Sequence, residues 1–586
     1  MLNNKFSKLI LLLLFPLLSL SMITACSDDN GTSTGPDPDP QPSDPNLVEL
    51  AQSDENFSTL VNLVVDLGLA DVLATDELTV FAPTNAAFEA ISDIIPSLSN
   101  EDLTEIVTYH LTGGTILSNQ LGSSQDVEMV QGEKTLVTAS AAGVQVNGFA
   151  NVVQADLRAT NGVIHAIDQV LLPTEYRVAV QGPSLVEVAE DAGNFNTLLA
   201  LAEQVGLTTT LQFLGPFTAF APTDDAFDTL FSVVDPSGLT NEQIGFILFY
   251  HVLFGEVPSN ALEPTQVVST AAEEPIYITA NADGVTVNGT AQVIAPDVAA
   301  SNGIIHVVDN VLLPNVFTPV TSIVQKNFDL STLLTLVAER PAVLEALADP
   351  NGEFTVFAPN DDAFADALAA NPGLTEEQVT EILTYHVLVA RVLSGDLDEA
   401  QAVETLSGEE IFVTVNNGTV NINNSVNVVE ADFVGNNGAV HVIDGVLLPN
   451  AYTPVTGIVA KNYNLSTLLS LVAEREDILN LLAGEGEFTV FAPTNEAFDA
   501  ALEAFPDLTE EQITEILTYH VLGAQVLSTD LSDGQTAATL QGENISVSIN
   551  GGVQINNANV IGADFIGTNG VVHIIDAVIL PPSYTE

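Results

Sequence analysis

The sequence contains very little cysteine, tryptophan and positive charge. Among 586 residues there are one cysteine, no tryptophan, and 10 lysines and arginines against 77 aspartates and glutamates. A single cysteine excludes an intramolecular disulfide framework and a zinc site built on several thiolates. The net charge of −67 excludes electrostatic binding to nucleic acid, because phosphate groups are bound mainly by lysine and arginine. It also argues against a basic patch for anionic lipid headgroups.

Apolar side chains, by contrast, are abundant. They make up 46% of the residues, and the mean hydropathy is +0.32. Such a chain can bury sizeable cores and is not a disordered acidic polymer. At roughly 150 residues per domain, the length predicts about four domains.

The first 25 residues have the pattern of a secretory signal peptide. Lys5 and Lys8 form a short positive region, the apolar run Leu9–Leu18 follows, and small residues come next. The apolar run is too short for a membrane-spanning helix, so the pattern predicts an exported protein whose residues 1–25 are removed.

The segment Ile23-Thr24-Ala25-Cys26 resembles the lipobox of bacterial lipoproteins. That resemblance implies that Cys26 is lipidated and that the protein is anchored in the outer membrane, facing the cell surface. The alternative is an ordinary export signal with an incidental cysteine. Residues 26–46 are rich in Pro, Asp, Ser and Thr, which predicts a solvated, disordered stalk between the anchor and the first domain.

Three short strings recur four times along the chain. In each copy the first is a ten-residue string that contains Phe-Ala-Pro. The second is a Tyr-His pair whose copies lie 141, 135 and 134 residues apart, and the third is NGVIHAIDQVLLP with three variants. A period this long indicates whole domains in tandem rather than a solenoid of short units. The first string reads TVFAPTNAAF from Thr79, TAFAPTDDAF from Thr218, TVFAPNDDAF from Thr355 and TVFAPTNEAF from Thr489.

The first half of the third copy predicts helices around one strand. An apolar stripe over Leu330–Ala338 predicts the opening helix, and Phe354–Ala358 predicts a strand. Asn360 is placed to cap the next helix. Thr375-Glu376-Glu377-Gln378 forms a capping box, and the helix after it carries an apolar stripe that ends at His386.

The second half of the same copy predicts strands. Ile411–Val415 and Thr419–Ile422 alternate in polarity around a turn at Asn416-Asn417-Gly418, and a last strand runs over Ala439–Leu448. Helices in the first half and strands in the second predict an α+β domain.

In this order, the FAPTNxAF string, the Tyr-His pair and the NGxxHxID string resemble the fasciclin domain. The resemblance implies that each of the four copies is a wedge of β-strands packed with several helices, and the joints between copies predict that the domains are arranged as a string. It also implies adhesion and matrix contact, because family members are mostly secreted or membrane-anchored proteins with such roles. The expected domains span residues 47–174, 184–315, 319–450 and 454–582.

The recurring histidines permit two interpretations. Within a copy, two histidines 53 to 55 residues apart and one Asp, such as His386, His441 and Asp444, could form a hydrolytic or metal site. However, no Ser, Cys or Glu near the strings occupies a position typical of a nucleophile or base. We therefore favour the second interpretation, in which the histidines are buried and bond to backbone or to the recurring Asp. They are His110, His165, His251, His306, His386, His441, His520 and His573.

The tyrosine beside the first histidine of each copy is the remaining candidate for partner contact. It points to another side of its helix than the histidine, so we expect it to be half exposed. The four tyrosines are Tyr109, Tyr250, Tyr385 and Tyr519.

The second and third joints between copies are short. The second and third each carry an aromatic residue before Thr-Pro, Phe317 and Tyr452, which we expect to dock on a neighbouring domain. The first joint is longer and contains Gly182-Pro183, which predicts freer bending.

These features predict a lipid-anchored surface protein that acts by multivalent binding and not as an enzyme. The partner is a cell-surface or matrix protein or a glycan, with weak self-association left open, and the membrane is contacted through the anchor only. A glycan-binding or structural display lipoprotein is the alternative, and an unrecognised hydrolase is the third reading. We expect no cofactor and no metal; the acidic surface fits solubility in salty water better than calcium bridging.

Overall fold

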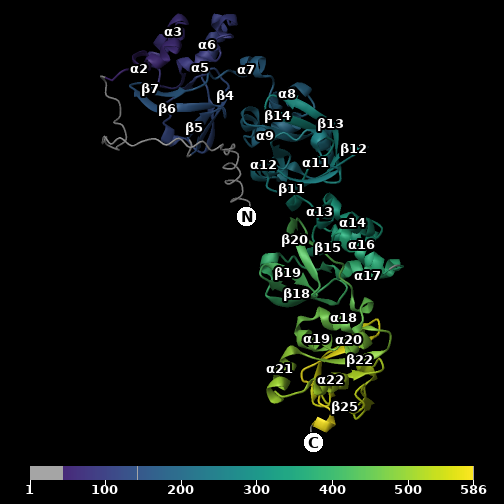
Figure 1. The fold of residues 1–586 in the computed structure, drawn as a ribbon. Coiled ribbons are helices and arrows are strands. Elements are labelled where there is room, and N and C mark those ends of the chain that lie inside the picture. Colours follow the sequence, from purple (N-terminus) through teal and green to yellow (C-terminus); the bar gives the residue numbers. More distant parts are fainter. Residues whose placement is uncertain (1–43, 141–142, 372, 585–586) are drawn as a thin grey trace, which may run out of the picture. The chain divides into compact units, whose positions relative to one another are not determined.

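The computed structural model describes residues 44–140, 143–371 and 373–584 (Figure 1). The predicted signal peptide, Cys26 and residues 26–43 of the predicted stalk lie outside the described residues. The chain divides into two compact units after Pro314. Two copies of one α+β fold, which we call modules 1 and 2, lie in the first unit, and modules 3 and 4 lie in the second.

Every module has the same order of helices and strands within the described residues. In module 1 it is α2 (Leu47–Ser53), α3 (Ser58–Asp66), α4 (Ala70–Thr75), β1 (Leu78–Pro83), α5 (Asn85–Glu89), α6 (Asn100–Thr108), β2 (Leu111–Gly113), β3 (Ser124–Glu128), β4 (Lys134–Ser140), β5 (Gly143–Val146), β6 (Ala150–Ala159) and β7 (Gly162–Ile167). In module 2 it is α8 (Leu185–Ala192), α9 (Asn196–Gln204), α10 (Thr208–Phe213), β8 (Phe217–Pro222), α11 (Asp224–Phe231), α12 (Asn241–Phe249), β9 (Val252–Phe254), β10 (Thr265–Ser269), β11 (Pro275–Asn281), β12 (Gly284–Val287), β13 (Ala291–Ala300) and β14 (Gly303–Val308).

The second unit repeats this order twice. Module 3 has α13 (Val320–Lys326), α14 (Ser331–Ala338), α15 (Pro341–Leu347), β15 (Phe354–Pro359), α16 (Asp361–Ala370), α17 (Glu376–Tyr385), β16 (Val387–Leu388), β17 (Ala400–Glu404), β18 (Glu410–Asn416), β19 (Thr419–Ile422), β20 (Val426–Gly435) and β21 (Gly438–Ile443). Module 4 has α18 (Val455–Lys461), α19 (Ser466–Ala473), α20 (Glu476–Ala483), β22 (Phe488–Pro493), α21 (Asn495–Ala504), α22 (Glu510–Tyr519), β23 (Val521–Leu522), β24 (Thr536–Ala538), β25 (Asn544–Ile549), β26 (Val553–Ile555), β27 (Ala558–Gly567) and β28 (Gly570–Ile575).

The seven strands of a module form one mixed sheet. In module 3 their order is β16-β15-β21-β20-β19-β18-β17. Strands β15 and β21 pair in parallel, which sets Phe357 of the first string opposite His441 of the third. The strand of the first half therefore lies inside the sheet of the second half, a pairing that the order of the elements along the chain did not predict.

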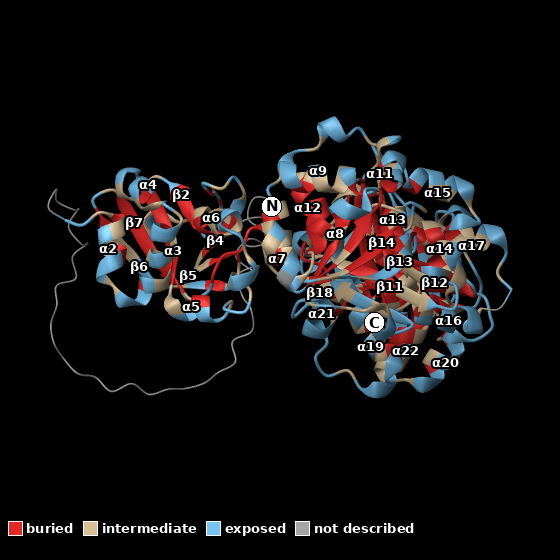
Figure 2. Ribbon diagram, turned by 90° about the horizontal axis from the view of Figure 1, so that it is seen from above, coloured by how far each residue is buried: buried red, intermediate tan, exposed pale blue. Residues whose placement is uncertain are grey.

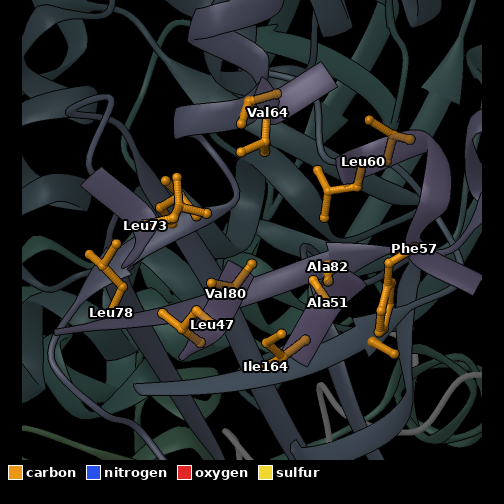
Figure 3. Close-up of a cluster of buried hydrophobic side chains, with 14 of the residues drawn as sticks. Leu47, Ala51, Phe57, Leu60, Val64, Leu73, Leu78, Val80, Ala82 and Ile164 are labelled. Carbon is orange, nitrogen blue, oxygen red and sulfur yellow. The ribbon is translucent and has the colours of Figure 1, made fainter. Parts of the chain in front are cut away.

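Two apolar clusters fill modules 1, 3 and 4, one beneath the helices and one within the strand-rich half. In module 3 the first includes Val320, Leu333 and Val356, and the second includes Tyr385 and Ile411. The parallel strands β15 and β21 of module 3 are buried along their whole length, and exposed residues are frequent on helices and turns (Figure 2). Figure 3 shows the helix-side cluster of module 1, with side chains of α2, α3 and α4 converging on β1.

Local sequence explains several helix starts. The Asn360 side chain accepts a hydrogen bond from the amide of Ala363, and Thr375 and Gln378 form the predicted capping box. The turn between β18 and β19 has Asn417 and Gly418 at φ +51° and +83°, as its two positive-φ positions require.

Three predicted elements differ from the structure. The helix that contains Leu333 is not the first of its module, because α13 precedes it. The last strand ends at Ile443, before the predicted end at Leu448. The first joint, for which the sequence predicted only greater length and freer bending, contains the helix α7 (Thr174–Gln181).

Candidate functional site

The histidine of the Tyr-His pair is buried and fully hydrogen-bonded. His386 is the C-cap of α17; its Nδ1 lies 2.7 Å from the carbonyl oxygen of Ile382, and its Nε2 accepts from the amide of Leu447 at 2.8 Å. Because a carbonyl can only accept, Nδ1 carries the proton and the ring is neutral. His110, His251 and His520 have the same two kinds of partner. Burial lowers the pKa of these four imidazoles to about 4.

The histidine of the third string is the opposite tautomer. Nδ1 of His441 accepts from the amide of Asp432 at 3.2 Å, so Nε2 carries the proton and donates to the carbonyl oxygen of Val392 at 3.0 Å. Its ring stacks on Phe357 with centroids 5.7 Å apart. Burial also lowers the pKa of His441. His165, His306 and His573 bond in the same way, and all eight histidines are 1–4% exposed.

A backbone irregularity places the partner of His441. Strand β20 shifts register between Glu430 and Phe433, and Asp432 there has a φ of +64°. This turns the amide of Asp432 toward the imidazole, while its carboxylate accepts from both the amide and the hydroxyl of Ser394. The sequence predicted a bond to the recurring Asp444 as one option, but the carboxylate of Asp444 accepts instead from the amide and side chain of Asn427.

The tyrosines are completely buried, so the expectation that Tyr109, Tyr250, Tyr385 and Tyr519 are half exposed is wrong. The hydroxyl of Tyr385 donates to the carbonyl oxygen of Glu410 at 3.0 Å and accepts from Nδ2 of Asn423 at 3.2 Å. Burial raises the pKa of Tyr385. The other three have equivalent partners. The helix ends at Tyr385, and the side chain enters the cluster of the strand-rich half. None of the four tyrosines is available to a partner.

The Asn of the NG pair, directly before the last strand of each module, is joined to the start of the first helix by a hydrogen bond. Oδ1 of Asn437 accepts from the amide of Val320, the first residue of α13, at 2.9 Å, and Nδ2 donates to the carbonyl oxygens of Leu347 and Asp349. Asn161, Asn302 and Asn569 make the same three kinds of bond. Sequence reasoning identified only a turn here and missed this contact across more than 100 residues.

The Gly of the NG pair allows two strands to approach closely. Gly570 has a φ of +154°, and a Cβ there would lie 2.1 Å from the carbonyl oxygen of Phe488 on the parallel strand β22. Only glycine fits this position without moving the strand.

The hydrogen bonds of these repeated histidines leave no ring nitrogen available to a substrate. The two histidines of module 3 share no hydrogen-bond partner, and all four ring nitrogens are used by backbone groups. Over residues 44–140, 143–371 and 373–584, no group of three His, Cys, Asp or Glu side chains is placed to hold a metal ion. In the same residues we find no helix that is both long and apolar enough to cross a membrane.

Side chains in the joints form hydrogen bonds and an ion pair with the adjoining modules. The hydroxyl of Tyr452 bonds to Glu381 on α17 at 2.6 Å, and Nζ of Lys461 bonds to Oδ1 of Asn450 at 3.0 Å. Burial lowers the pKa of Lys461 to about 8. In the first joint, Arg177 of α7 forms a buried ion pair with Glu187 of α8. The freer bending expected there does not agree with this ion pair.

The modules differ at their exposed apolar positions. Three residues after the histidine of the Tyr-His pair, module 2 has Phe254 (49% exposed) and module 3 has Val389 (63% exposed), where modules 1 and 4 have Gly113 and Gly523. The outer surfaces are thus not equivalent, although the internal hydrogen bonds are.

The fold and these bonds define the class of protein: a tandem array of α+β modules, each built around the same hydrogen-bonded Tyr, His and Asn residues. The model of the Fasciclin domain matches residues 55–173, 193–314, 328–449 and 463–581. The chain belongs to the fasciclin domain family, with four tandem copies.

Several known proteins are similar to the chain, two of them over most of its length. Human periostin is 28% identical over 86% of this chain and 60% of its own length, and pig transforming growth factor-beta-induced protein ig-h3 is 29% identical over 86% and 73%. The chain therefore spans about 60% of periostin. Protein sll1483 of Synechocystis is 43% identical over 22% of this chain and 73% of its own length. A solved FAS1 domain pair from the insect cell adhesion molecule fasciclin I is 22% identical, covering 44% of this chain and 98% of that one, with a TM-score of 0.35.

Proposed function

We propose that this protein is a surface-anchored adhesion or matrix-contact protein that acts by multivalent binding through its four modules and not by catalysis. One observation carries the proposal: all eight histidines are buried, and their ring nitrogens bond to backbone groups. The family membership supports the role in adhesion and matrix contact that the recurring strings implied.

Multivalency follows from the tandem arrangement. Linking weak sites on one chain raises the effective concentration of the second site once the first is bound. The unequal exposed residues at Phe254, Val389 and their glycine counterparts support different contacts by different modules.

An adhesion assay tests the proposal. Beads coated with the full chain, with and without calcium, are presented to cells of the source, to matrix proteins and to a glycan array. We expect saturable attachment to cells or matrix that exceeds attachment of uncoated beads. Binding to defined saccharides alone would favour the alternative, a glycan-binding display protein, and no attachment to any surface would contradict both.

We further propose that Cys26 is the lipid anchor. The argument is its position at the end of the lipobox-like segment and the absence of any other cysteine in the sequence. Cys26→Ser should prevent incorporation of a labelled fatty acid and release the protein from the outer-membrane fraction. Unchanged labelling or unchanged fractionation would contradict the anchor but leave the adhesion proposal standing.

A further inference from the structure

Each module has an apolar pocket between its first three helices and its sheet, which we call the helical pocket. In module 2 it is lined by residues of α8, α9, α10 and β8, with a cavity volume of about 60 Å³. The equivalent cavities measure about 30 Å³ in modules 3 and 4 and about 20 Å³ in module 1. Module 2 therefore has the largest of these four cavities.

The sequence explains why the pocket of module 2 is larger. Ala202 of α9 and Ala219 of β8 line it. The other modules have Val at both positions: Val64 and Val80, Val337 and Val356, and Val472 and Val490. Two valines have been replaced by alanine in the same cavity, which removes four methyl groups from a close-packed region.

The pocket of module 2 also has a buried hydroxyl without a hydrogen-bond partner, which the linings of the other three pockets do not have among the described residues. The hydroxyl oxygen of Thr208 is buried and has no hydrogen-bond partner among the described residues. Modules 3 and 4 have Leu344 and Leu479 at this position. A buried hydroxyl without a partner is unfavourable unless something bonds to it. His251 also lines the pocket, but both of its ring nitrogens already bond to backbone groups.

We propose that the helical pocket of module 2 binds a small neutral aliphatic molecule that ends in a hydroxyl or carbonyl oxygen. The chain lies among the aliphatic side chains, and the oxygen bonds to the hydroxyl of Thr208. The pocket lining contains no lysine or arginine, and the chain has a net charge of −67, so a carboxylate or phosphate would find no counter-charge. Leu198, Leu199 and Leu211 are only partly buried, which leaves the entrance on the surface of the module.

Titration with 1-hexanol tests the proposal on the full chain. Alanine methyl groups labelled with ¹³C report directly on Ala202 and Ala219, and calorimetry gives the affinity. We expect saturable shifts of these two methyl signals with 1-hexanol and none with hexanoate. Shifts that grow linearly without saturation, or equal binding of hexanoate, would overturn the proposal.

Two variants separate a binding site from a packing defect. Thr208→Val keeps the shape and removes the hydroxyl, so it should weaken 1-hexanol binding about fivefold or more and leave n-hexane binding unchanged. Ala202→Val with Ala219→Val should abolish binding of both. The Ala202→Val and Ala219→Val pair adds volume and could overpack the module. Thr208→Val keeps the volume, so its result tests the proposal without that complication. Retained 1-hexanol affinity in either variant would overturn the proposal. Val472→Ala with Val490→Ala in module 4 is the matched control and should leave the module 2 signals unchanged.

Discussion

Thr355 and His441 bond to the amide and to the carbonyl oxygen of one residue, Val392. The hydroxyl of Thr355 accepts from the amide of Val392 at 2.9 Å, and Nε2 of His441 donates to its carbonyl oxygen at 3.0 Å. The first and third strings, far apart in sequence, thus meet at one loop in module 3. The pairs Thr79 and His165, Thr218 and His306, and Thr489 and His573 repeat the arrangement. The recurrence of these strings has a structural explanation that needs no ligand.

Truncating His441 should destabilise module 3 without removing any chemistry. His441→Ala leaves the amide of Asp432 and the carbonyl of Val392 without their partner, and it opens a cavity beside Phe357. Unsatisfied buried groups and a cavity together cost about 4 kcal/mol. Urea unfolding measures this loss of unfolding free energy. The exposed Glu404→Ala in the same module is the control, and a stable His441→Ala variant that has lost adhesion would contradict the structural role.

Mild acid should destabilise the modules through the first histidine of each copy. In the folded state the pKa of His386 and His520 is about 4, lowered from 6.5 by burial. Between pH 6.5 and 4 the unfolded chain therefore binds more protons, so unfolding free energy falls as the pH falls, by on the order of 3 kcal/mol for each histidine at full effect.

Urea unfolding followed by the fluorescence of the buried tyrosines, at pH 7.5 and 5, measures this effect. His386→Gln with His520→Gln removes two of the four buried histidines of the second unit and should reduce the pH dependence there, while His441 and His573, whose pKa burial also lowers, remain. An identical pH dependence in the variant would show that other groups cause the acid sensitivity.

Asn437 should be as sensitive as the histidine. Asn437→Ala removes the cap of α13 and the donor for the carbonyls of Leu347 and Asp349, at an expected cost of about 3 kcal/mol. Asn437→Asp should cost at least as much, because its second oxygen would face two carbonyl oxygens. Hydrogen exchange at the Val320 amide should rise in both variants. The neighbouring Asn436→Ala is the control, and a neutral Asn437→Asp would contradict the assigned orientation of the amide.

Local signals in the sequence predicted a large part of the fold. Helix starts follow from caps such as Asn360 and Thr375, whose partners lie within three residues. The turn at Asn417-Gly418 has the same kind of local cause. The α+β class followed from the order of the elements.

Long-range pairing limited what the sequence could predict about the candidate site. The side chain of Tyr385 was misplaced because helical periodicity says nothing about the second apolar cluster, which forms only when β18 to β20 fold over it. The partner of His441 was missed because a register shift at Asp432 sets its direction. The bond between Asn437 and Val320 joins the two ends of a module, and no local pattern signals it.

The first joint should depend on its ion pair. Arg177 and Glu187 have side chains 4% and 11% exposed, and Gln212 also bonds to the carboxylate. Arg177→Met leaves a buried carboxylate without its cation, which costs about 3 to 5 kcal/mol. Glu187→Gln on that background should recover most of the loss. A double-mutant cycle on thermal unfolding measures the coupling, and additive effects of the two substitutions would contradict a paired role.

The state of the histidine rings is the most direct test of the central claim, that the recurring residues build the modules and do not form a reactive site. Long-range ¹H–¹⁵N spectra of the imidazoles distinguish tautomers and protonation. We predict a proton on Nδ1 of His110, His251, His386 and His520, a proton on Nε2 of His165, His306, His441 and His573, and no titration of the first four above pH 5. An imidazole among those four that titrates near pH 6.5, or any of the eight whose signals move when a divalent metal is added, would contradict the account.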